Sequence, residues 1–392
     1  MISQTRWALV LVVVLTGVAA ATNVGKVAPV VPLIQQELGL NLSNIGWVVS
    51  VYSLLAMLLC LPMSLLATKI GNYRMALGAL LLMGSGGLIS AYADGFNLLM
   101  LGRMTEGLGF VMIAVTAPAL IARVVTIKDR PIAMTMWSLW LPMGVSVTLL
   151  SAPLLMGWSG WRLLWQASGW FSLFCLLVVG VSFFNIGRSG DRQAAITKAE
   201  LADLFHRDSW LLVLSFICFG SVYTTAIAFA PTFWHEVHGI SLASGALLLA
   251  PVMLCTMVGN ISSGILIKRG FLVNRLLVYC FVVPALLGGL AFIEGLPFWL
   301  QYLFFIIFAS LTGMVPTAIM AIAPSYTYNP VQIGPMVALV FQGATTGQFI
   351  GPILFSQLIE YQQYNWTWSL LFFGGFALLG GSLMYFIRPS RY

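Results

Sequence analysis

Residues 7–31 read WALVLVVVLTGVAAATNVGKVAPVV, an apolar run that carries one charged side chain, Lys26. A helix that crosses the hydrocarbon core of a bilayer needs about 20 such residues. Eleven further apolar stretches follow along the chain, at 42–67, 75–93, 96–121, 132–158, 163–184, 210–233, 240–267, 276–293, 298–323, 331–359 and 366–387. Lipid offers the backbone no hydrogen bonds, so we expect each stretch to be a helix. The sequence therefore predicts an all-α, polytopic membrane protein with twelve transmembrane helices.

Composition excludes the main alternatives. Hydrophobic residues make up 60% of the chain and charged residues 7%, whereas soluble domains have about 25% charged residues. The net charge of +7 comes from basic residues in the gaps between stretches, so it does not indicate nucleic-acid binding. The five cysteines fall inside the predicted spans without paired spacing, which indicates buried packing rather than disulfides.

The basic residues predict an orientation. Arg162 is the one basic residue in the gaps on one side of the membrane, and positively charged loops stay cytoplasmic. We therefore expect a multi-pass protein of the inner (cytoplasmic) membrane with both termini in the cytoplasm. The residues on the predicted cytoplasmic side are Arg6, Lys69, Arg74, Arg123, Lys128, Arg130, Arg188, Arg192, Lys198, Arg207, Lys268, Arg269, Arg275, Arg388 and Arg391.

A hydrophilic interval divides the chain into two sets of six spans. The predicted organisation is an N-terminal six-helix bundle at 1–184, a cytoplasmic linker at 185–208 and a C-terminal six-helix bundle at 209–392. Within the linker, Ala194–Phe205 fits either a short amphipathic helix at the membrane surface or a solvated connection.

Internal similarity indicates that the halves are duplicates. Three features of the first half recur about 200 residues later in the second. They are SLLATKIG at 64–71 with GILIKRG at 264–270, WRLLW at 161–165 with WTWSL at 366–370, and Pro131 with Pro335.

Several motifs resemble those of the major facilitator superfamily. RMTEGLGF at 103–110 is similar to the fourth-span signature, an Arg followed by a glycine-rich face, whereas 64–74 lacks the acidic residue of the second-span signature. The stretches 25–32, 103–110, 160–162 and 341–352 resemble the bacterial cyanate and nitroimidazole permease branch. This resemblance implies two six-helix bundles around a central cavity, transport by alternating access, and a part for Arg103 in proton coupling.

Ionisable groups within spans are the first candidates for function, because each costs about 2.5–3.5 kcal/mol on insertion scales. Lys26 fits either an ammonium that binds an anionic substrate or a lysine that snorkels to the headgroups. Arg103 and Glu106 are three residues apart and can pair on one helix face. Glu106 is then either a carboxylate that changes protonation during transport or part of a static pair. We expect Lys26 to be the more available cation, since Arg103 has Glu106 beside it.

Uncharged polar and aromatic residues within the spans complete the predicted substrate site, although each also fits ordinary packing. A Gln in lipid needs a hydrogen-bond partner and should face protein or a cavity. Glycines at 84, 86, 87, 343 and 347 indicate close helix packing. The added substrate-site candidates are Asn23, Tyr52, Trp137, Gln342 and Gln348.

Two patterns suggest metal ligands, but packing and loop interpretations fit them better. His235 and His238 lie three apart rather than the four of a zinc-protease helix, and Met253, Cys255 and Met257 belong to an apolar span. We predict no bound metal and no cofactor.

The sequence also lacks a nucleophile, acid and base clustered near one membrane face, and it lacks a P-loop. It predicts a non-enzymatic secondary transporter, a monomer in the bilayer, for a small organic or inorganic anion, with a proton as the candidate coupling ion. The alternative is a drug or metabolite efflux permease.

Overall fold

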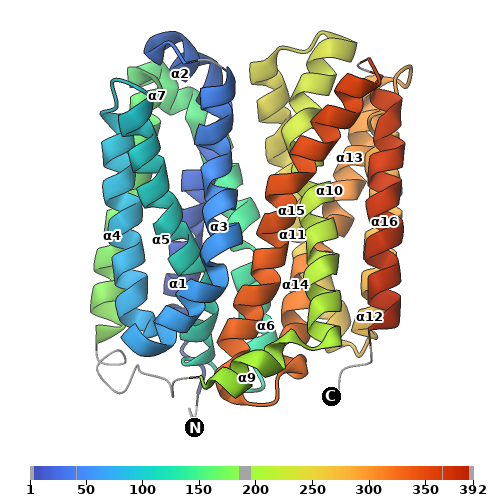
Figure 1. The fold of residues 1–392 in the computed structure, drawn as a ribbon. Coiled ribbons are helices and arrows are strands. Elements are labelled where there is room, and N and C mark those ends of the chain that lie inside the picture. Colours follow the sequence, from blue (N-terminus) through green and yellow to red (C-terminus); the bar gives the residue numbers. More distant parts are fainter. Residues whose placement is uncertain (1–3, 41, 185–195, 364, 388–392) are drawn as a thin grey trace. The chain divides into compact units, whose positions relative to one another are not determined.

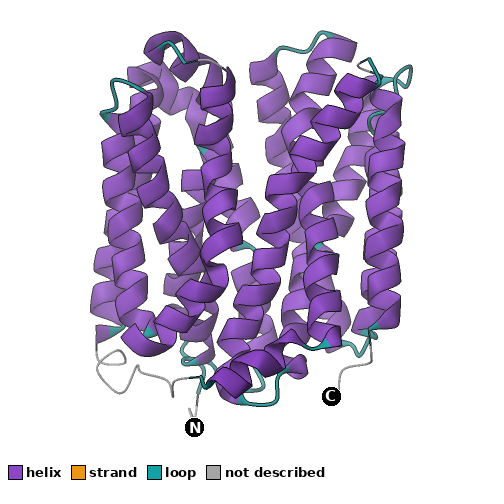
Figure 2. Cartoon of the chain, in the orientation of Figure 1, coloured by secondary structure: helices purple, strands orange, loops and turns teal. Residues whose placement is uncertain are grey.

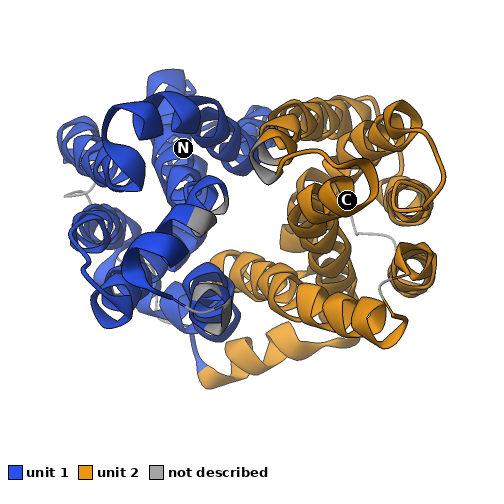
Figure 3. Ribbon diagram, turned by 90° about the horizontal axis from the view of Figure 1, so that it is seen from above, with its two compact units in different colours: residues 1–197 blue, residues 198–392 orange. Residues whose placement is uncertain are grey.

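The structure is a computed structural model that describes residues 4–40, 42–184, 196–363 and 365–387. The described residues are almost entirely helical, with no strand among them (Figure 2). The chain forms two compact units, Met1–Thr197 and Lys198–Tyr392, coloured separately in Figure 3. The boundary between the units falls inside the predicted linker, of which residues 185–195 lie outside the described part of the chain.

Unit 1 contains the first half of the predicted spans (Figure 1). Its helices are α1 (Trp7–Gly25), the 3₁₀ turn η1 (Ala28–Val30), α2 (Val31–Leu38), α3 (Leu42–Ile70), α4 (Asn72–Ala91), α5 (Phe96–Ala122), α6 (Arg130–Ser138) and α7 (Trp140–Ser182).

Unit 2 contains the second half. Its helices are α9 (Lys198–Ala202), η2 (Asp203–Phe205), α10 (Arg207–His238), α11 (Leu242–Lys268), α12 (Val273–Leu290), α13 (Phe298–Thr312), α14 (Met314–Ile322), η3 (Ala323–Tyr326), η4 (Pro330–Gln332), α15 (Ile333–Tyr361), η5 (Trp366–Trp368) and α16 (Ser369–Phe386).

The segment Arg130–Ser182 comprises two spans rather than one. Its 53 residues would extend about 80 Å as one helix at 1.5 Å per residue, far more than the roughly 30 Å of a hydrocarbon core. Ser159 and Gly160 interrupt α7, and Gly160 has a φ of 68°, which favours glycine. With this break, the eleven long apolar segments of the described chain become twelve spans, as predicted.

The first span is shorter than predicted. The sequence indicated a helix as far as Val31, but α1 ends at Gly25 and the chain continues through η1 into α2. Pro29 and Pro32 explain the change, because proline supplies no backbone N–H and disfavours helix in the residue before it. Lys26 therefore lies at the C-terminal cap of α1.

Glycines bring the helices into close contact, as predicted. A Cβ at Gly84 would lie 2.5 Å from the Leu173 side chain on α7, and one at Gly86 would lie 2.7 Å from the Gly102 carbonyl on α5. In unit 2, Cβ atoms at Gly343 and Gly347 would meet carbonyl oxygens of α10 at 2.6 and 2.0 Å. Side chains at these positions would push the helices apart.

The described part of the linker is helical and packs on unit 2. Residues 198–205 form α9 and η2, within the range for which the sequence fitted either a short helix or a solvated connection. The Gln332 side chain is buried and donates to the carbonyl of Glu200 at 2.7 Å, while its own oxygen accepts from the backbone N–H groups of Tyr328 and Asn329. The linker helix is thus fixed to the segment that precedes α15.

Candidate functional site

The ionisable residues predicted within spans meet inside unit 1. Arg103 and Glu106 lie one turn apart on α5, and Arg103 Nη1 donates to Glu106 Oε2 at 2.7 Å. Lys26 Nζ donates to the other carboxylate oxygen, Oε1, also at 2.7 Å. All three side chains are buried, with exposed fractions of 1% or less. One carboxylate therefore bridges two cations.

Lys26 is not the more available cation, and that prediction was wrong. Its ammonium also donates to Asn23 Oδ1 at 2.7 Å and to Ser168 Oγ at 2.8 Å, and it lies 4.9 Å from the centre of the Trp165 ring. These contacts follow from the early end of α1, which places the side chain against α5 and α7. Lys26 is thus buried and bonded to Glu106, as Arg103 is.

Arg103 connects three helices. Its Nε donates to the carbonyl of Val48 on α3 at 3.1 Å, and its Nη1 donates to the carbonyl of Asn23 on α1 at 2.9 Å. The guanidinium lies over the Tyr52 ring at 4.1 Å, and the Tyr52 hydroxyl donates to Glu106 Oε2 at 3.0 Å. We call Asn23, Lys26, Tyr52, Arg103 and Glu106 the charge cluster.

Small residues on α4 make room for the carboxylate. A Cβ at Gly86 would lie 2.7 Å from the backbone nitrogen of Glu106 and 2.9 Å from its Cγ. A Cβ at Gly87 would lie 3.4 Å from Glu106 Oε1 and 3.0 Å from Gly169 on α7. The carboxylate can occupy this position only because α4 presents glycines to it.

An aromatic row runs from the charge cluster to Trp137. Ring centres are 5.3 Å apart for Tyr52 and Phe110, 5.7 Å for Phe110 and Trp140, and 5.2 Å for Trp140 and Trp137. Trp137 itself is buried on α6. The predicted residues of the first half thus form one connected group.

The two predicted glutamines belong to the other unit. Gln342 and Gln348 are half-buried on α15. The charge cluster is built without them, so their part in a substrate site remains a prediction.

Two serines that bond to the charge cluster were not predicted as site residues. Ser168 accepts from Lys26, and Ser172 accepts from Asn23 Nδ2 at 3.2 Å. The signal was present in the sequence, because residues 161, 165, 168 and 172 recur at helical spacing on one face of α7. Serine is small and common in spans, so the pattern alone did not single it out.

The metal-like patterns have other contacts. His235 Nδ1 lies 2.9 Å from the carbonyl of Ile240, and His238 Nε2 lies 2.6 Å from Gln301 Oε1. Met253 Sδ lies 3.5 Å from the Tyr223 hydroxyl. Within the described part of the chain, no three His, Cys, Asp or Glu residues gather closely enough to hold a metal.

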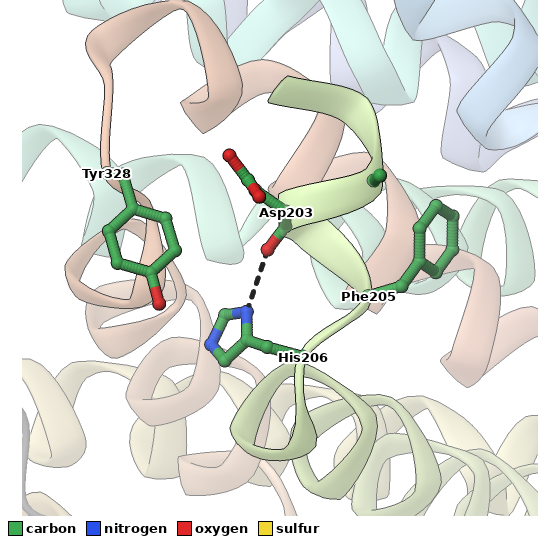
Figure 4. A pocket seen from close by; sticks show the side chains of 5 residues that line it. Asp203, Phe205, His206 and Tyr328 are labelled. Carbon is green, nitrogen blue, oxygen red and sulfur yellow. Dashed lines mark hydrogen bonds between the residues drawn. The ribbon is translucent and has the colours of Figure 1, made fainter. Parts of the chain in front are cut away.

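A separate surface pocket of about 430 Å³ lies in unit 2 (Figure 4). Tyr328 and His206 are among the residues that line it, and the His206 Nδ1 atom lies 3.0 Å from the Asp203 carbonyl. Ala202, Asp203 and Phe205 complete the lining. The pocket contains no predicted site residue.

Comparison with known proteins assigns the family. The family model described as Major Facilitator Superfamily matches residues 9–332. The chain belongs to this superfamily. It is therefore a multi-pass membrane transporter, not an enzyme, and its substrates are small molecules.

Individual relatives agree with this assignment. The chain is 25% identical to a "Probable sulfoacetate transporter SauU" of Cupriavidus necator, over 91% of this chain and 88% of that protein. It is 24% identical to the cyanate transport protein CynX of Escherichia coli K12, over 61% of this chain and 62% of CynX. The predicted resemblance to the cyanate permease branch is thereby confirmed.

A solved structure supports the fold. The proton:xylose symporter XylE, bound to 6-bromo-6-deoxy-D-glucose, superposes with a TM-score of 0.77 and covers 97% of this chain and 96% of XylE. At 14% identity, this likeness concerns the fold alone, and it confirms the all-α fold of two six-helix bundles.

Proposed function

We propose that this protein moves a small organic or inorganic anion across the cytoplasmic membrane by alternating access, with a proton as the coupling ion. The observation that carries the proposal is the charge cluster, in which Lys26 and Arg103 share one carboxylate and leave a net charge of +1 without solvent contact. An unbalanced charge in a low-dielectric interior is costly, and a bound anion relieves that cost.

The names of two relatives support the same class of substrate. SauU is described as a transporter of sulfoacetate and CynX as a transporter of cyanate, and both solutes are small anions. Neither name fixes the substrate of this chain. The shared chemistry is a compact anion that fits between an ammonium and a guanidinium.

Glu106 supplies the coupling step in this proposal. Protonation of its carboxylate would remove the charge that holds Lys26 and Arg103 together, and the cluster would go from +1 to +2. Both cations could then turn toward an anion. Because linkage is reciprocal, the anion would favour protonation of Glu106 to the same degree. Proton and anion would therefore travel together, as in a symporter.

The aromatic row favours an alternative function, the efflux of uncharged solutes. Tyr52, Phe110, Trp140 and Trp137 offer an apolar face of the kind that a drug or metabolite efflux permease uses for uncharged solutes. Efflux of uncharged solutes does not require the buried excess positive charge, so we rank anion transport ahead of it.

The remaining features of the proposal follow from the sequence. The protein is placed in the inner membrane as a monomer with both termini in the cytoplasm, and residues 185–208 form a cytoplasmic linker between the bundles 1–184 and 209–392. Arg103 binds the anion together with Lys26, and Gln342 and Gln348 contribute hydrogen bonds from the second bundle.

The test is thermal stabilisation of the purified full chain by sulfoacetate, cyanate, formate and a panel of neutral drugs. A ligand at 100 times its Kd adds about 2.7 kcal/mol to the stability of the folded state. We expect at least one anion to raise the Tm, Lys26→Gln to lose most of that rise, and Lys26→Arg to keep part of it. Stabilisation by neutral solutes alone, together with normal transport by Lys26→Gln, would establish the efflux permease instead.

A further inference from the structure

Both units have the same arrangement at the end of their first helix. In unit 1, the Trp161 indole N–H donates to Glu37 Oε2 at 2.6 Å. In unit 2, the Trp366 indole N–H donates to Glu236 Oε2 at 3.0 Å. Each Glu follows or ends the first span of its unit, and each Trp opens the sixth. The two tryptophans belong to the motif that recurs between the halves.

A second contact connects each Trp region to the end of the third span of its unit. Arg162 Nη1 donates to the carbonyls of Ala91 and Ala93, at 2.9 and 2.7 Å, where α4 ends. The backbone N–H of Trp366 donates to Glu294 Oε1 at 2.8 Å, just after α12. We call Glu37, Trp161 and Arg162 the unit 1 clamp, and Glu236, Glu294 and Trp366 the unit 2 clamp.

The unit 1 clamp contains an ion pair in addition to the indole bond. Glu37 Oε1 accepts from both Arg162 Nε, at 3.0 Å, and Nη2, at 2.7 Å, while Oε2 accepts from Trp161; the Arg162 guanidinium lies 4.6 Å from the centre of the Trp161 ring. Both carboxylate oxygens of Glu37 are therefore bonded to the start of the sixth span, which fixes the orientation of the carboxylate. Glu37 belongs to α2, which lies at the end of unit 1 remote from its N-terminus (Figure 1), whereas Trp161 and Arg162 belong to α7.

The same face of α7 that carries the clamp also contacts Lys26. Trp161 bonds to Glu37, Trp165 lies beside the Lys26 ammonium, and Ser168 accepts from it. Between Lys26 and Glu37, Val27, Val30 and Ile34 are buried in one core with Trp161 and Trp165. The segment from Lys26 to Glu37 is therefore bonded to α7 at both ends, and three of its apolar residues share a core with the two tryptophans of α7.

We propose that Glu37 and Arg162 are positioning residues for Lys26, which keep its ammonium in register with Ser168 and Glu106. Loss of the clamp lets α2 and the end of α1 shift along α7, and the contact between Lys26 and Glu106 lengthens. Because it concerns the same cluster, this inference rests on the proposed function for its transport readout. The unit 2 clamp has the same indole–carboxylate bond but holds no segment that bears Lys26, so it provides the matched control.

The readout is the pH dependence of proton-driven uptake in proteoliposomes, with sulfoacetate as the probe. The groups that face Glu106 are Lys26 from α1, Tyr52 from α3 and Arg103 from α5, while α4 presents glycines. Because the clamp positions one of these groups, Lys26, we expect the pH at which uptake is half-maximal to shift in Glu37→Gln relative to the wild type.

Titration of Glu37 itself does not account for such a shift. The hydrogen bonds from Arg162 and from the Trp161 indole hold the pKa of Glu37 below its usual value, which is about 4.3. The clamp therefore stays ionised throughout an assay between about pH 5.5 and 8.

We expect Glu236→Gln to keep the wild-type pH profile and Glu37→Asp to recover most of it, because the carboxylate is retained. If Glu37→Gln does not insert, Trp161→Phe removes the indole donor and keeps the ring. A profile unchanged in both Glu37→Gln and Trp161→Phe would overturn the inference, even if the Tm fell.

A second measurement needs no substrate. If the clamp positions Lys26, the double variant Glu37→Gln/Lys26→Gln should lose less Tm than the sum of the losses in the two single variants. In the control, Glu236→Gln/Lys26→Gln, the two losses should sum, because the effects of independent sites are additive. If Lys26→Gln takes up anions normally, the proposed function fails, and the comparison of single and double variants alone tests whether the unit 1 clamp positions Lys26. Additive losses for Glu37 and Lys26 would refute the clamp whatever the substrate is.

Discussion

Glu106 holds more of the site together than any other residue. It accepts from Lys26, Arg103 and Tyr52, which belong to three different helices. Removing one partner of a buried ion pair typically costs about 3–5 kcal/mol, because the remaining charge has no counter-charge. Here two cations depend on one carboxylate, so its charge controls the geometry of both.

We predict that Glu106→Gln abolishes or uncouples transport while the protein still inserts in the membrane. The amide keeps the shape of the side chain but leaves Lys26 and Arg103 facing each other without a negative charge. Uptake as a function of pH measures the effect, and membrane yield checks insertion. Arg103→Lys is the companion variant, because it keeps the charge and loses the bonds to Val48 and Asn23. Uptake by Glu106→Gln with the wild-type rate and pH dependence would remove Glu106 from the mechanism.

Most of the charge cluster could be predicted from the sequence, because charged residues are rare within membrane spans. Lys26, Arg103 and Glu106 stood out by their position in apolar stretches, and the spacing of Arg103 and Glu106 indicated their pairing. Which residue meets Lys26 depends on how α1 packs against α5 and α7, and no local pattern encodes that. For the same reason the bonds from Lys26 to Glu106 and from Lys26 to Ser168 were visible only in the structure.

At the scale of elements, the position of the site depends on how closely α4 and α5 approach. Gly86 on α4 lies against the backbone of Glu106 and Gly102, so the two helices touch without intervening side chains. The sequence predicted close packing from the glycines. It did not predict that one such contact forms the slot for the carboxylate, since the slot needs a third helix, α7, at Gly169.

We predict that Gly86→Ala destabilises the protein by about 1–3 kcal/mol, the usual cost of overpacking, and reduces uptake. Its Cβ would meet backbone atoms at 2.7 Å, which cannot move without separating the helices. Gly78→Ala on the same helix is the control, because its Cβ would meet only the Met112 Cε atom at 3.6 Å. Thermal unfolding in detergent compares the two. Equal Tm values for both variants would show that α4 and α5 have room to separate.

At the scale of the whole chain, the arrangement of spans was predictable and the ends of the helices were not. Hydrophobic length determines where a helix can cross, whereas proline and glycine determine where it stops. The predicted first span therefore ran past Gly25, whereas the break at Ser159 and Gly160 falls in the gap predicted between the fifth and sixth spans. Each unit then repeats the contact between the end of its first span and the Trp that opens its sixth.

The last prediction concerns orientation, which follows from the distribution of positive charge. Fifteen of the eighteen lysines and arginines are expected on one side and Arg162 on the other. Single cysteines at Lys128 and Lys198 should therefore be protected from an impermeant thiol reagent in intact cells, whereas cysteines at Asp94 and Glu360 should react.

All four positions are exposed, and Asp94 and Lys128 lie beyond opposite ends of α5. Of the native cysteines, four are buried and Cys255 is half-buried. The single cysteines are therefore introduced in a Cys255→Ala background, which reduces labelling of the native cysteines. Permeabilised cells should label at all four positions. Reaction at 128 and 198 with protection at 94 and 360 would invert the topology and place the clamps on the cytoplasmic side.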